Sequence, residues 1–497
     1  MPAGPAVTEH ARFRDAAAIV LLRGEGESRQ VYWVKRGDAV SFMPGFHAFP
    51  GGTVGPADTE FPVSGERDEH ERTLRACAVR ELFEEIGVLL ARSGGLDRAR
   101  LGVARERLLT GERTFAELAE EHRWQVRGED LAFAGRWQTP PFSAARYDTT
   151  YYLARVPAGP EPTIEDRELA AGEWIAPARA IERWRDGEVA LAPPVLHILE
   201  EIARGDEDLA ERLASAPERA GRPVRRIEFK WGVVLCAMRT RPAPPATHTN
   251  AYLVGEGEMA LVDPGAGEPA ELEGLFDLIA ALAADGRRLS CVLLTHHHPD
   301  HVGGVDPVRE RFRVPVLAHA ETARHVSVDR TLADGETVRL AAPRRPWELR
   351  VLHTPGHARG HLCLLEERAR SLFTGDDIVV GSTVVIDPPE GDMAAYMASL
   401  ERLAALPAEF LFPGHGTPQG AAQRRARSLL RHRREREERV LRALANEPRG
   451  LTDLVEFAYA DVSRDLWTWA ERSLLAHLLK LEAEGRAARE GESWRLA

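Results

Sequence analysis

The sequence predicts a multidomain chain of the α/β class, and three observations lead to that prediction. Its 497 residues exceed what one hydrophobic core usually holds, because domains average about 100–200 residues. Hydrophobic residues make up 44% of the chain, which is enough to fill several cores. Polar motifs lie on a helix-type segment near residue 80 and directly after an apolar, strand-type segment near residue 291. About three domains built from helices and strands are therefore expected.

The first motif is an acidic helix. Residues 80–88 read Arg-Glu-Leu-Phe-Glu-Glu-Ile-Gly-Val, so Glu81, Glu84 and Glu85 fall at positions i, i+3 and i+4 and share one helix face. Such a face is what Mg²⁺ ions need when they neutralise a diphosphate. A solvated, Glu-rich helix would have the same spacing, so the motif alone leaves both interpretations open.

Together with Phe42-Met-Pro-Gly-Phe-His-Ala-Phe-Pro-Gly-Gly52, this motif resembles the Nudix box, in the acyl-coenzyme A diphosphatase branch of Nudix hydrolases. The resemblance implies an α/β/α sandwich over residues 1–210 that uses magnesium or manganese. It also implies a nucleoside-diphosphate-linked substrate such as coenzyme A. Glu81, Glu84 and Glu85 would bind the metal. The catalytic carboxylates would be Glu84, Glu85 and the later Glu168, which would assist the metal or the water.

Two positions depart from the pattern of that family. Arg72, eight residues before Arg80, stands where the box has Glu, and the neighbouring Glu71 is the candidate substitute. Ser41 stands where the longer coenzyme A signature has a second Arg. The departures concern one metal contact and the coenzyme A specificity, and they leave the three glutamates of the helix intact.

The second motif is a histidine-rich loop. Residues 295–304 read Thr-His-His-His-Pro-Asp-His-Val-Gly-Gly and follow the apolar run Cys291-Val-Leu-Leu, which predicts a loop that leaves a buried strand. Three further candidates occur downstream: His357 and His415 each follow a Pro-Gly turn, and Asp376 follows Phe-Thr-Gly at a strand end. A fortuitous surface loop would lack such partners. Imidazoles and carboxylates together suit zinc best, with manganese or iron as alternatives.

Residues 226–430 resemble the metallo-β-lactamase superfamily, which implies an αββα sandwich with two metal ions that share a hydroxide. The hydroxide would attack an ester, thioester or similar bond, and Asp300 would relay the proton. Asp263 resembles the structural Asp of the family, and His297 and His361 are expected to support the ligands rather than bind metal. The implied ligand sets are His296, His298 and His357 for one ion, Asp300, His301 and His415 for the other, and Asp376 as the bridge.

The C-terminal residues 431–497 predict a small winged helix. Two helix-sized segments precede a short hairpin around Gly491, and the Arg-rich stretch at residues 424–442 should form a connecting helix. This region resembles the β-lactamase-like endoribonuclease branch, which implies cleavage of single-stranded RNA as an alternative activity. Two interpretations of its basic side chains stay open: contact with phosphates, or neutralisation by nearby glutamates. The arginines concerned are Arg431, Arg433, Arg434, Arg436, Arg486 and Arg489.

The composition of the chain indicates its cellular environment and the kinds of partner it binds. The net charge of −12 argues against indiscriminate nucleic-acid binding. Four scattered cysteines without a C-x-x-C pair, no signal sequence and no membrane span indicate a cytoplasmic protein. We therefore expect a two-headed metal-dependent hydrolase of small thioesters or esters and of nucleoside-diphosphate-linked molecules. The alternatives are an RNA-cleaving C-terminal half and a non-enzymatic winged-helix regulator with inactive catalytic shells.

Overall fold

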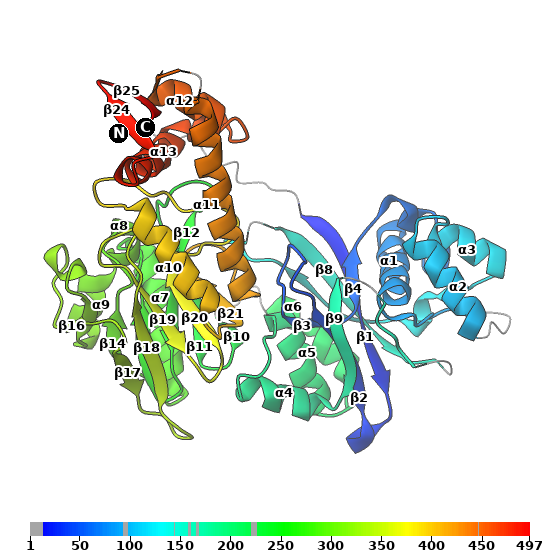
Figure 1. Ribbon diagram of the computed structural model, residues 1–497. Coiled ribbons are helices and arrows are strands. Elements are labelled where there is room, and N and C mark those ends of the chain that lie inside the picture. The colour runs from blue at the N-terminus through cyan, green and yellow to red at the C-terminus, as the bar shows by residue number, and fades with distance from the viewer. Residues whose placement is uncertain are drawn as a thin grey trace. The chain divides into compact units, whose positions relative to one another are not determined.

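The computed structural model describes residues 13–92, 98–143, 145–157, 161–165, 168–219, 226–445 and 447–497 (Figure 1). The chain divides into two compact units, an N-terminal unit, Met1–Arg225, and a C-terminal unit, Arg226–Ala497. Among the helices of the described ranges, none combines the length and the apolar character needed to cross a membrane. The four cysteines are free thiols.

The N-terminal unit is built on one mixed sheet in which β1 and β8 run parallel at the centre. The order is β3-β2-β1-β8-β7, with β4 paired to β1 and β9 paired to β2. Figure 1 shows α1–α3 on one side of this sheet and α4–α6 on the other, which is the predicted α/β/α sandwich. The sheet strands are β1 (Arg14–Arg23), β2 (Gln30–Arg36), β3 (His47–Ala48), β4 (Gly51–Thr53), β7 (Ala132–Gln138), β8 (Tyr147–Arg155) and β9 (Leu169–Ile175), and β5 (Val63–Ser64) pairs with β6 (Val126–Arg127). The helices are α1 (Glu69–Ile86), α2 (Arg98–Leu109), α3 (Phe115–His122), α4 (Pro177–Arg185), α5 (Pro193–Ala203) and α6 (Leu209–Arg219).

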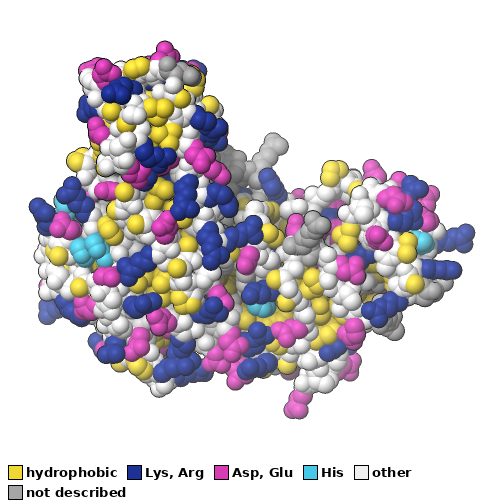
Figure 2. Space-filling model, viewed as in Figure 1, with side chains coloured by type: hydrophobic (Ala, Val, Ile, Leu, Met, Phe, Trp, Pro, Cys, Tyr) yellow, Lys and Arg dark blue, Asp and Glu magenta, His cyan; other side chains and the backbone are white. Residues whose placement is uncertain are grey.

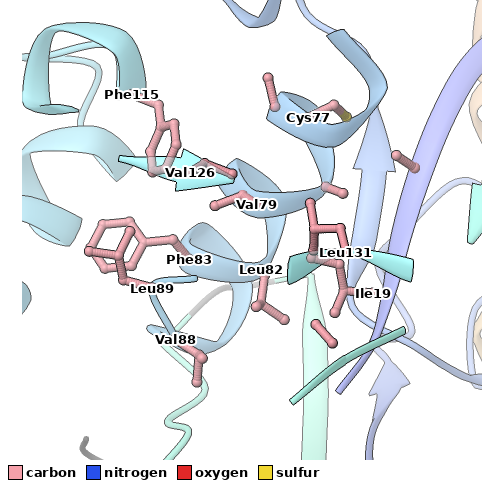
Figure 3. Close-up of a cluster of buried hydrophobic side chains, with 14 of the residues drawn as sticks. Ile19, Cys77, Val79, Leu82, Phe83, Val88, Leu89, Phe115, Val126 and Leu131 are labelled. Atoms are coloured by element: carbon pink, nitrogen blue, oxygen red, sulfur yellow. The ribbon is translucent and has the colours of Figure 1, made fainter. Parts of the chain in front are cut away.

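Helix α1 carries the acidic motif and is fixed at both ends. The Asp68 side chain accepts a hydrogen bond from the first turn, and Gly87, in the left-handed conformation with φ 71°, ends the helix. Its apolar face, including Leu82 and Phe83, packs into a buried cluster with Ile19 of β1 (Figure 3). Of the three glutamates of the motif, Glu85 is buried and Glu81 and Glu84 are partly exposed.

The C-terminal unit begins with two sheets packed face to face. Helices α7 and α9 share a core with the first sheet, and α10 and α11 share a core with the second. Between the sheets, the Tyr252 ring lies 5.5 Å from that of Phe373 and 5.4 Å from that of Phe412. These layers form the predicted αββα sandwich.

The first sheet runs β10-β11-β12-β13-β14-β15-β16 and the second runs β17-β18-β19-β20-β21-β22. The strands of the first are β10 (Ile227–Lys230), β11 (Val233–Arg239), β12 (His248–Val254), β13 (Glu258–Val262), β14 (Arg288–Leu293), β15 (Val316–His319) and β16 (Arg330–Leu332). Those of the second are β17 (Thr337–Leu340), β18 (Trp347–His353), β19 (Leu362–Glu366), β20 (Ser371–Gly375), β21 (Phe410–Pro413) and β22 (Gln419–Gly420). The helices are α7 (Pro269–Ala284), α8 (Pro299–Val302), α9 (Val305–Phe312), α10 (Met393–Ala405) and α11 (Ala422–Leu444).

A small winged-helix module closes the chain. It comprises the end of α11, α12 (Leu451–Ala458), α13 (Trp467–Ala483) and a three-stranded sheet of β23 (Arg449–Gly450), β24 (Ala487–Glu490) and β25 (Ser493–Leu496). Val440, Leu474 and Trp494 lie in its core, so α11 belongs both to the sandwich and to this module. The β24–β25 hairpin turns at Gly491, where φ is 63°. Both the connecting helix and the hairpin agree with the sequence prediction.

Candidate active sites

Four loops at strand ends bring the seven side chains of the histidine motif together. His296 and His298 follow β14, and the short helix α8 carries Asp300 and His301. The remaining three residues follow β18, β20 and β21 and are His357, Asp376 and His415. His296, His301, Asp376 and His415 are buried, and His298, Asp300 and His357 are partly exposed.

Three imidazole nitrogens meet in the first group. The Nδ1 atom of His298 lies 3.0 Å from Nε2 of His296 and 2.9 Å from Nε2 of His357. Burial lowers the pKa of His298 to about 4 and that of His357 to about 3, and it holds the pKa of His296 well below its usual range. Three neutral imidazoles whose nitrogens point at one another form a donor set that suits a zinc-like cation.

The second group contains Asp300, His301 and His415. The Nε2 atoms of the two histidines are 3.3 Å apart, and Nε2 of His415 lies 3.4 Å from a carboxylate oxygen of Asp300. Burial alone would lower the pKa of both histidines, but the carboxylates of Asp376 and Asp300 raise it, to about 9 for His415. This group therefore attracts positive charge, either as protons or as a cation.

Asp376 lies between the two groups. Its Oδ1 atom is 3.3 Å from Nε2 of His301 and of His415, and its Oδ2 atom is 3.6 Å from Nε2 of His357. Oδ1 is buried and accepts no hydrogen bond. A buried carboxylate oxygen without a donor is costly unless a cation satisfies it, so the site fits a metal pair that Asp376 would bridge.

Hydrogen bonds from residues outside the two ligand groups fix the ring orientation of four histidines. Asp263 accepts hydrogen bonds from the N–H and the hydroxyl of Thr295 at 2.8 and 2.6 Å, and it contacts Nδ1 of His301 at 2.9 Å. The Thr295 hydroxyl in turn contacts Nδ1 of His296 at 2.9 Å. Asp263 therefore supports one histidine of each group and leaves both Nε2 atoms free to bind metal.

The other two histidines donate to backbone carbonyls. Nδ1 of His357 donates to the Val385 carbonyl at 2.9 Å, and Nδ1 of His415 donates to the His248 carbonyl at 2.8 Å. Sequence reasoning missed both carbonyl partners. No side-chain pattern marks a carbonyl acceptor, so no signal in the sequence could have identified them.

His361 and His297 lie outside the two groups. The buried His361 accepts a hydrogen bond on Nε2 from the Asp376 N–H at 3.1 Å, and its Nδ1 lies 3.2 Å from the Asp377 carboxylate. A Cβ on Gly375 would come within 2.7 Å of the same Nε2 atom, so only glycine fits there. His297 stacks on His325 with ring centroids 4.0 Å apart. His361 therefore contacts the proposed ligand Asp376 through its backbone, and the supporting role expected for both histidines stays a prediction.

In the N-terminal unit, Arg80 organises the acidic face of α1. It donates to Glu81 at 2.9 Å and to Glu84 at 2.8 Å, and it makes a two-pronged contact with Asp58 at 2.7 and 2.9 Å. Asp58 is only 2% exposed and was not identified from the sequence, because it lies in the long interval before the box. Glu71, the candidate substitute, instead accepts from the Tyr152 hydroxyl at 3.0 Å.

The glycine-rich strand β4 lies against the same glutamates. Glu85 accepts a hydrogen bond from the Gly51 N–H at 2.9 Å. A Cβ on Gly52 would come within 2.4 Å of the Glu81 carboxylate, which explains the glycine. Burial raises the pKa of Glu81 to about 7, and Arg80 opposes that rise. Carboxylates this crowded favour a bound cation.

Glu168 is exposed at the turn before β9, and its carbonyl accepts a hydrogen bond from the Gly37 N–H at 2.7 Å. Glu81 and Glu85 lie against β4, whereas Glu168 directly precedes β9. Its assisting role therefore stays a prediction.

The arginines considered for phosphate contact are mostly engaged within the fold. Arg433 and Arg436 are buried and donate to backbone carbonyls, those of Val384 and Ala458. Figure 2 shows exposed basic side chains interspersed with acidic and apolar ones on the visible face. This arrangement favours a structural role for the Arg-rich helix. Further pairs are Arg434–Glu401, Arg486–Glu437 and Arg489 with the Gly491 carbonyl.

Family models match the chain in the predicted order. NUDIX domain matches residues 12–102 and NUDT19 Nudix domain matches residues 62–202. Metallo-beta-lactamase superfamily matches residues 244–415, and Beta-lactamase associated winged helix domain matches residues 451–494. These matches confirm the three predicted domain types and the hydrolase class, and they give the inactive-regulator alternative no support.

Curated relatives match the C-terminal half. The Beta-lactamase-like protein 2 homolog of Drosophila melanogaster is 30% identical over 256 residues, which are 48% of this chain and 83% of the relative. The Lactamase-like protein adaB of Aspergillus niger is 34% identical over 39% of this chain. The Atrochrysone carboxyl ACP thioesterase of Aspergillus fumigatus is 34% identical over 40% of this chain.

The chain spans 58% and 60% of the length of these two Aspergillus relatives. The Drosophila relative is matched over most of its length, and the superfamily model covers all seven converging side chains. The chain therefore belongs to the metallo-β-lactamase superfamily, and it carries a Nudix domain and a β-lactamase-associated winged helix in the same polypeptide.

Proposed function

We propose that the C-terminal unit is a dinuclear metal hydrolase that cleaves a thioester or ester. The observation that carries this proposal is the position of Asp376, whose two carboxylate oxygens face different ligand groups while Oδ1 has no hydrogen-bond donor. His296, His298 and His357 would hold one ion, and Asp300, His301 and His415 would hold the other. The ions would be zinc, or alternatively manganese or iron.

Two bound divalent cations would supply Lewis acidity and lower the pKa of a water molecule toward neutrality. The protein's own groups would orient the reaction. Burial alone would raise the pKa of Asp300, but the neighbouring histidines lower it, so this carboxylate is ionised and can accept a proton. Asp300 would pass that proton to the leaving group of the cleaved bond.

The thioester assignment rests on the hydrolytic chemistry of a two-metal site and on sequence similarity to one relative. The relative from Aspergillus fumigatus is described as an acyl carrier protein thioesterase, which supports a thioester-like substrate for this chain. Arg433 and Arg436 are buried, and the exposed Arg434 and the half-exposed Arg486 pair with glutamates, so we do not favour RNA. The proposed partner is a small molecule.

We propose that the N-terminal unit hydrolyses a nucleoside-diphosphate-linked molecule such as coenzyme A. Glu81, Glu84 and Glu85 would hold magnesium or manganese, with Glu84, Glu85 and Glu168 as the catalytic carboxylates. The crowding of Glu81 and Glu84 around Arg80 supports this ligand set. The proposed domain bounds are residues 1–210, 226–430 and 431–497.

Each of the two proposed hydrolytic sites can be tested with the other site as its control. The purified protein would be supplied with zinc and magnesium and assayed on acyl-coenzyme A, S-lactoylglutathione and single-stranded RNA. His298→Ala should abolish thioester hydrolysis and leave release of nucleotide from coenzyme A intact, and Glu84→Gln should do the reverse. Thioester turnover that persists in His298→Ala, or RNA cleavage as the sole metal-dependent activity, would contradict the proposal for the C-terminal unit.

A further inference from the structure

One loop touches a ligand of each proposed metal. Residues 378–390, here called the support loop, connect β20 to α10 and contain neither helix nor strand. The Val385 carbonyl accepts the hydrogen bond from Nδ1 of His357 at 2.9 Å. The Val380 N–H donates to the His415 carbonyl at 3.1 Å. The conformation of the support loop therefore sets the orientation of one histidine ring and the backbone position of another.

Because the support loop lacks regular structure, its carbonyls need partners from elsewhere. Arginines on α11 and α13 supply them. Arg425 donates to the Val379 carbonyl at 2.9 Å, and Arg433 donates to the Val384 carbonyl. From α13, Arg472 donates to the Pro388 carbonyl at 2.6 Å.

One peptide group links the winged-helix module to His357. The Val385 carbonyl and the Ile386 N–H belong to the same planar peptide group. Its carbonyl accepts from His357, and its N–H donates to the Ser473 hydroxyl of α13 at 3.3 Å. Because hydrogen bonds hold this peptide group on both sides, it has little freedom to rotate. Consecutive hydrogen bonds through one peptide group also polarise and strengthen each other. Ser473 is 4% exposed, so water does not compete for this contact.

Arg433 fixes the preceding peptide group through the Val384 carbonyl. Arg433 is only 2% exposed, its guanidinium carbon lies 5.3 Å from the centre of the Tyr396 ring, and none of the ion pairs of the described residues includes it. A buried cation without a carboxylate partner is costly, and an apolar side chain would stabilise the helix at least as well. This cost of burying the Arg433 charge is explained if its guanidinium is needed as the hydrogen-bond donor that holds the support loop.

We infer that α11 and α13 position the metal centre through the support loop, with Arg433 and Ser473 as positioning residues for His357. The inference rests on the proposed function of the C-terminal unit. It also gives a role to the Arg-rich helix: its buried arginines orient a ligand-bearing loop instead of contacting phosphates. The winged-helix module then contributes to the hydrolytic site of the same chain.

Zinc binding tests this inference on the full-length protein. Zinc affinity would be measured by competition with a chromophoric chelator, and kcat and KM would be measured with a thioester. Ser473→Ala should weaken one of the two zinc affinities about 10-fold, and Arg433→Met should weaken it about 10–100-fold, as for other residues that orient metal ligands. The value of kcat should fall more than KM changes, and Arg433→Lys should restore part of the loss because it keeps one donor.

Arg434→Ala is the matched control, since this neighbouring arginine pairs with Glu401 and makes no contact with the support loop among the described hydrogen bonds. It should retain both zinc affinities. Nudix activity of each preparation reports on the concentration of chains with a folded N-terminal unit, circular dichroism and thermal unfolding report on folding of the C-terminal unit, and Ser473→Ala decides the question if Arg433→Met does not fold. Wild-type zinc affinities and kcat in Ser473→Ala and in a folded Arg433→Met would overturn the inference. A wild-type protein that binds no zinc pair would overturn the proposed function, and the inference with it.

Discussion

Replacing Asp263 by Asn should damage both proposed metal sites at once. The substitution keeps the shape of the side chain, and Asn tolerates the left-handed backbone of this residue, where φ is 50°. One oxygen would still accept the Thr295 N–H. The other oxygen becomes an NH₂ group, which can no longer accept from the Thr295 hydroxyl or from Nδ1 of His301. His301 would then have to carry its proton on Nε2, the atom that faces Asp376.

A histidine with a protonated Nε2 cannot bind metal through that atom, so the affinity of the second site should fall about 10–100-fold, or about 1.4–2.7 kcal/mol. The first site should weaken less, because Asp263 reaches His296 only through Thr295. Chelator competition for zinc and kcat/KM with a thioester would measure both effects. Asp329→Asn is the control, since this carboxylate also accepts a backbone N–H but contacts Val316 and Arg309. Two zinc ions held by Asp263→Asn at wild-type affinity would show that Asp263 does not set the proton position of His301.

Three further predictions concern other parts of the chain. Gly52→Ala should lower diphosphate hydrolysis at least about 10-fold, because its Cβ would displace the Glu81 carboxylate, while thioester hydrolysis stays unchanged. Asp58→Asn should destabilise the N-terminal unit by about 2 kcal/mol in urea unfolding, because Arg80 loses one charged acceptor while Glu81 and Glu84 remain; an unchanged midpoint would contradict this. Burial alone would raise the pKa of Glu437, but its basic neighbours lower it to about 2. Its stabilisation is therefore complete above about pH 4.5 and is lost as the pH falls through 2, so in urea unfolding Glu437→Gln should cost about 2 kcal/mol at pH 7 and nothing well below pH 2.

The sequence predicted the side chains that converge in the C-terminal unit because their motifs restrict both residue type and position. His296, His298, Asp300 and His301 occupy one short loop, so a single strand end places all four. The same reasoning located the acidic face of α1, where helical spacing alone aligns the glutamates. Local periodicity and short motifs were sufficient for these elements.

The contacts that hold those side chains could not be predicted. Val385 and His248 accept hydrogen bonds from the ligand histidines through their backbone carbonyls. Every residue type has such a carbonyl, so the sequence cannot identify these partners. Asp58 lies outside the box and meets Arg80 only through tertiary folding. The sequence showed that the Arg-rich helix carries positive charge. It did not show that Arg433 is buried and donates a hydrogen bond to the support loop. Long-range packing decides each of these cases.

Anomalous diffraction from crystals grown with zinc would locate the proposed ions in the C-terminal unit. We expect two zinc ions per chain there, one among His296, His298 and His357 and one beside Asp300, His301 and His415, with Asp376 in contact with both. A single zinc ion, or two ions that do not share the Asp376 carboxylate, would contradict this expectation.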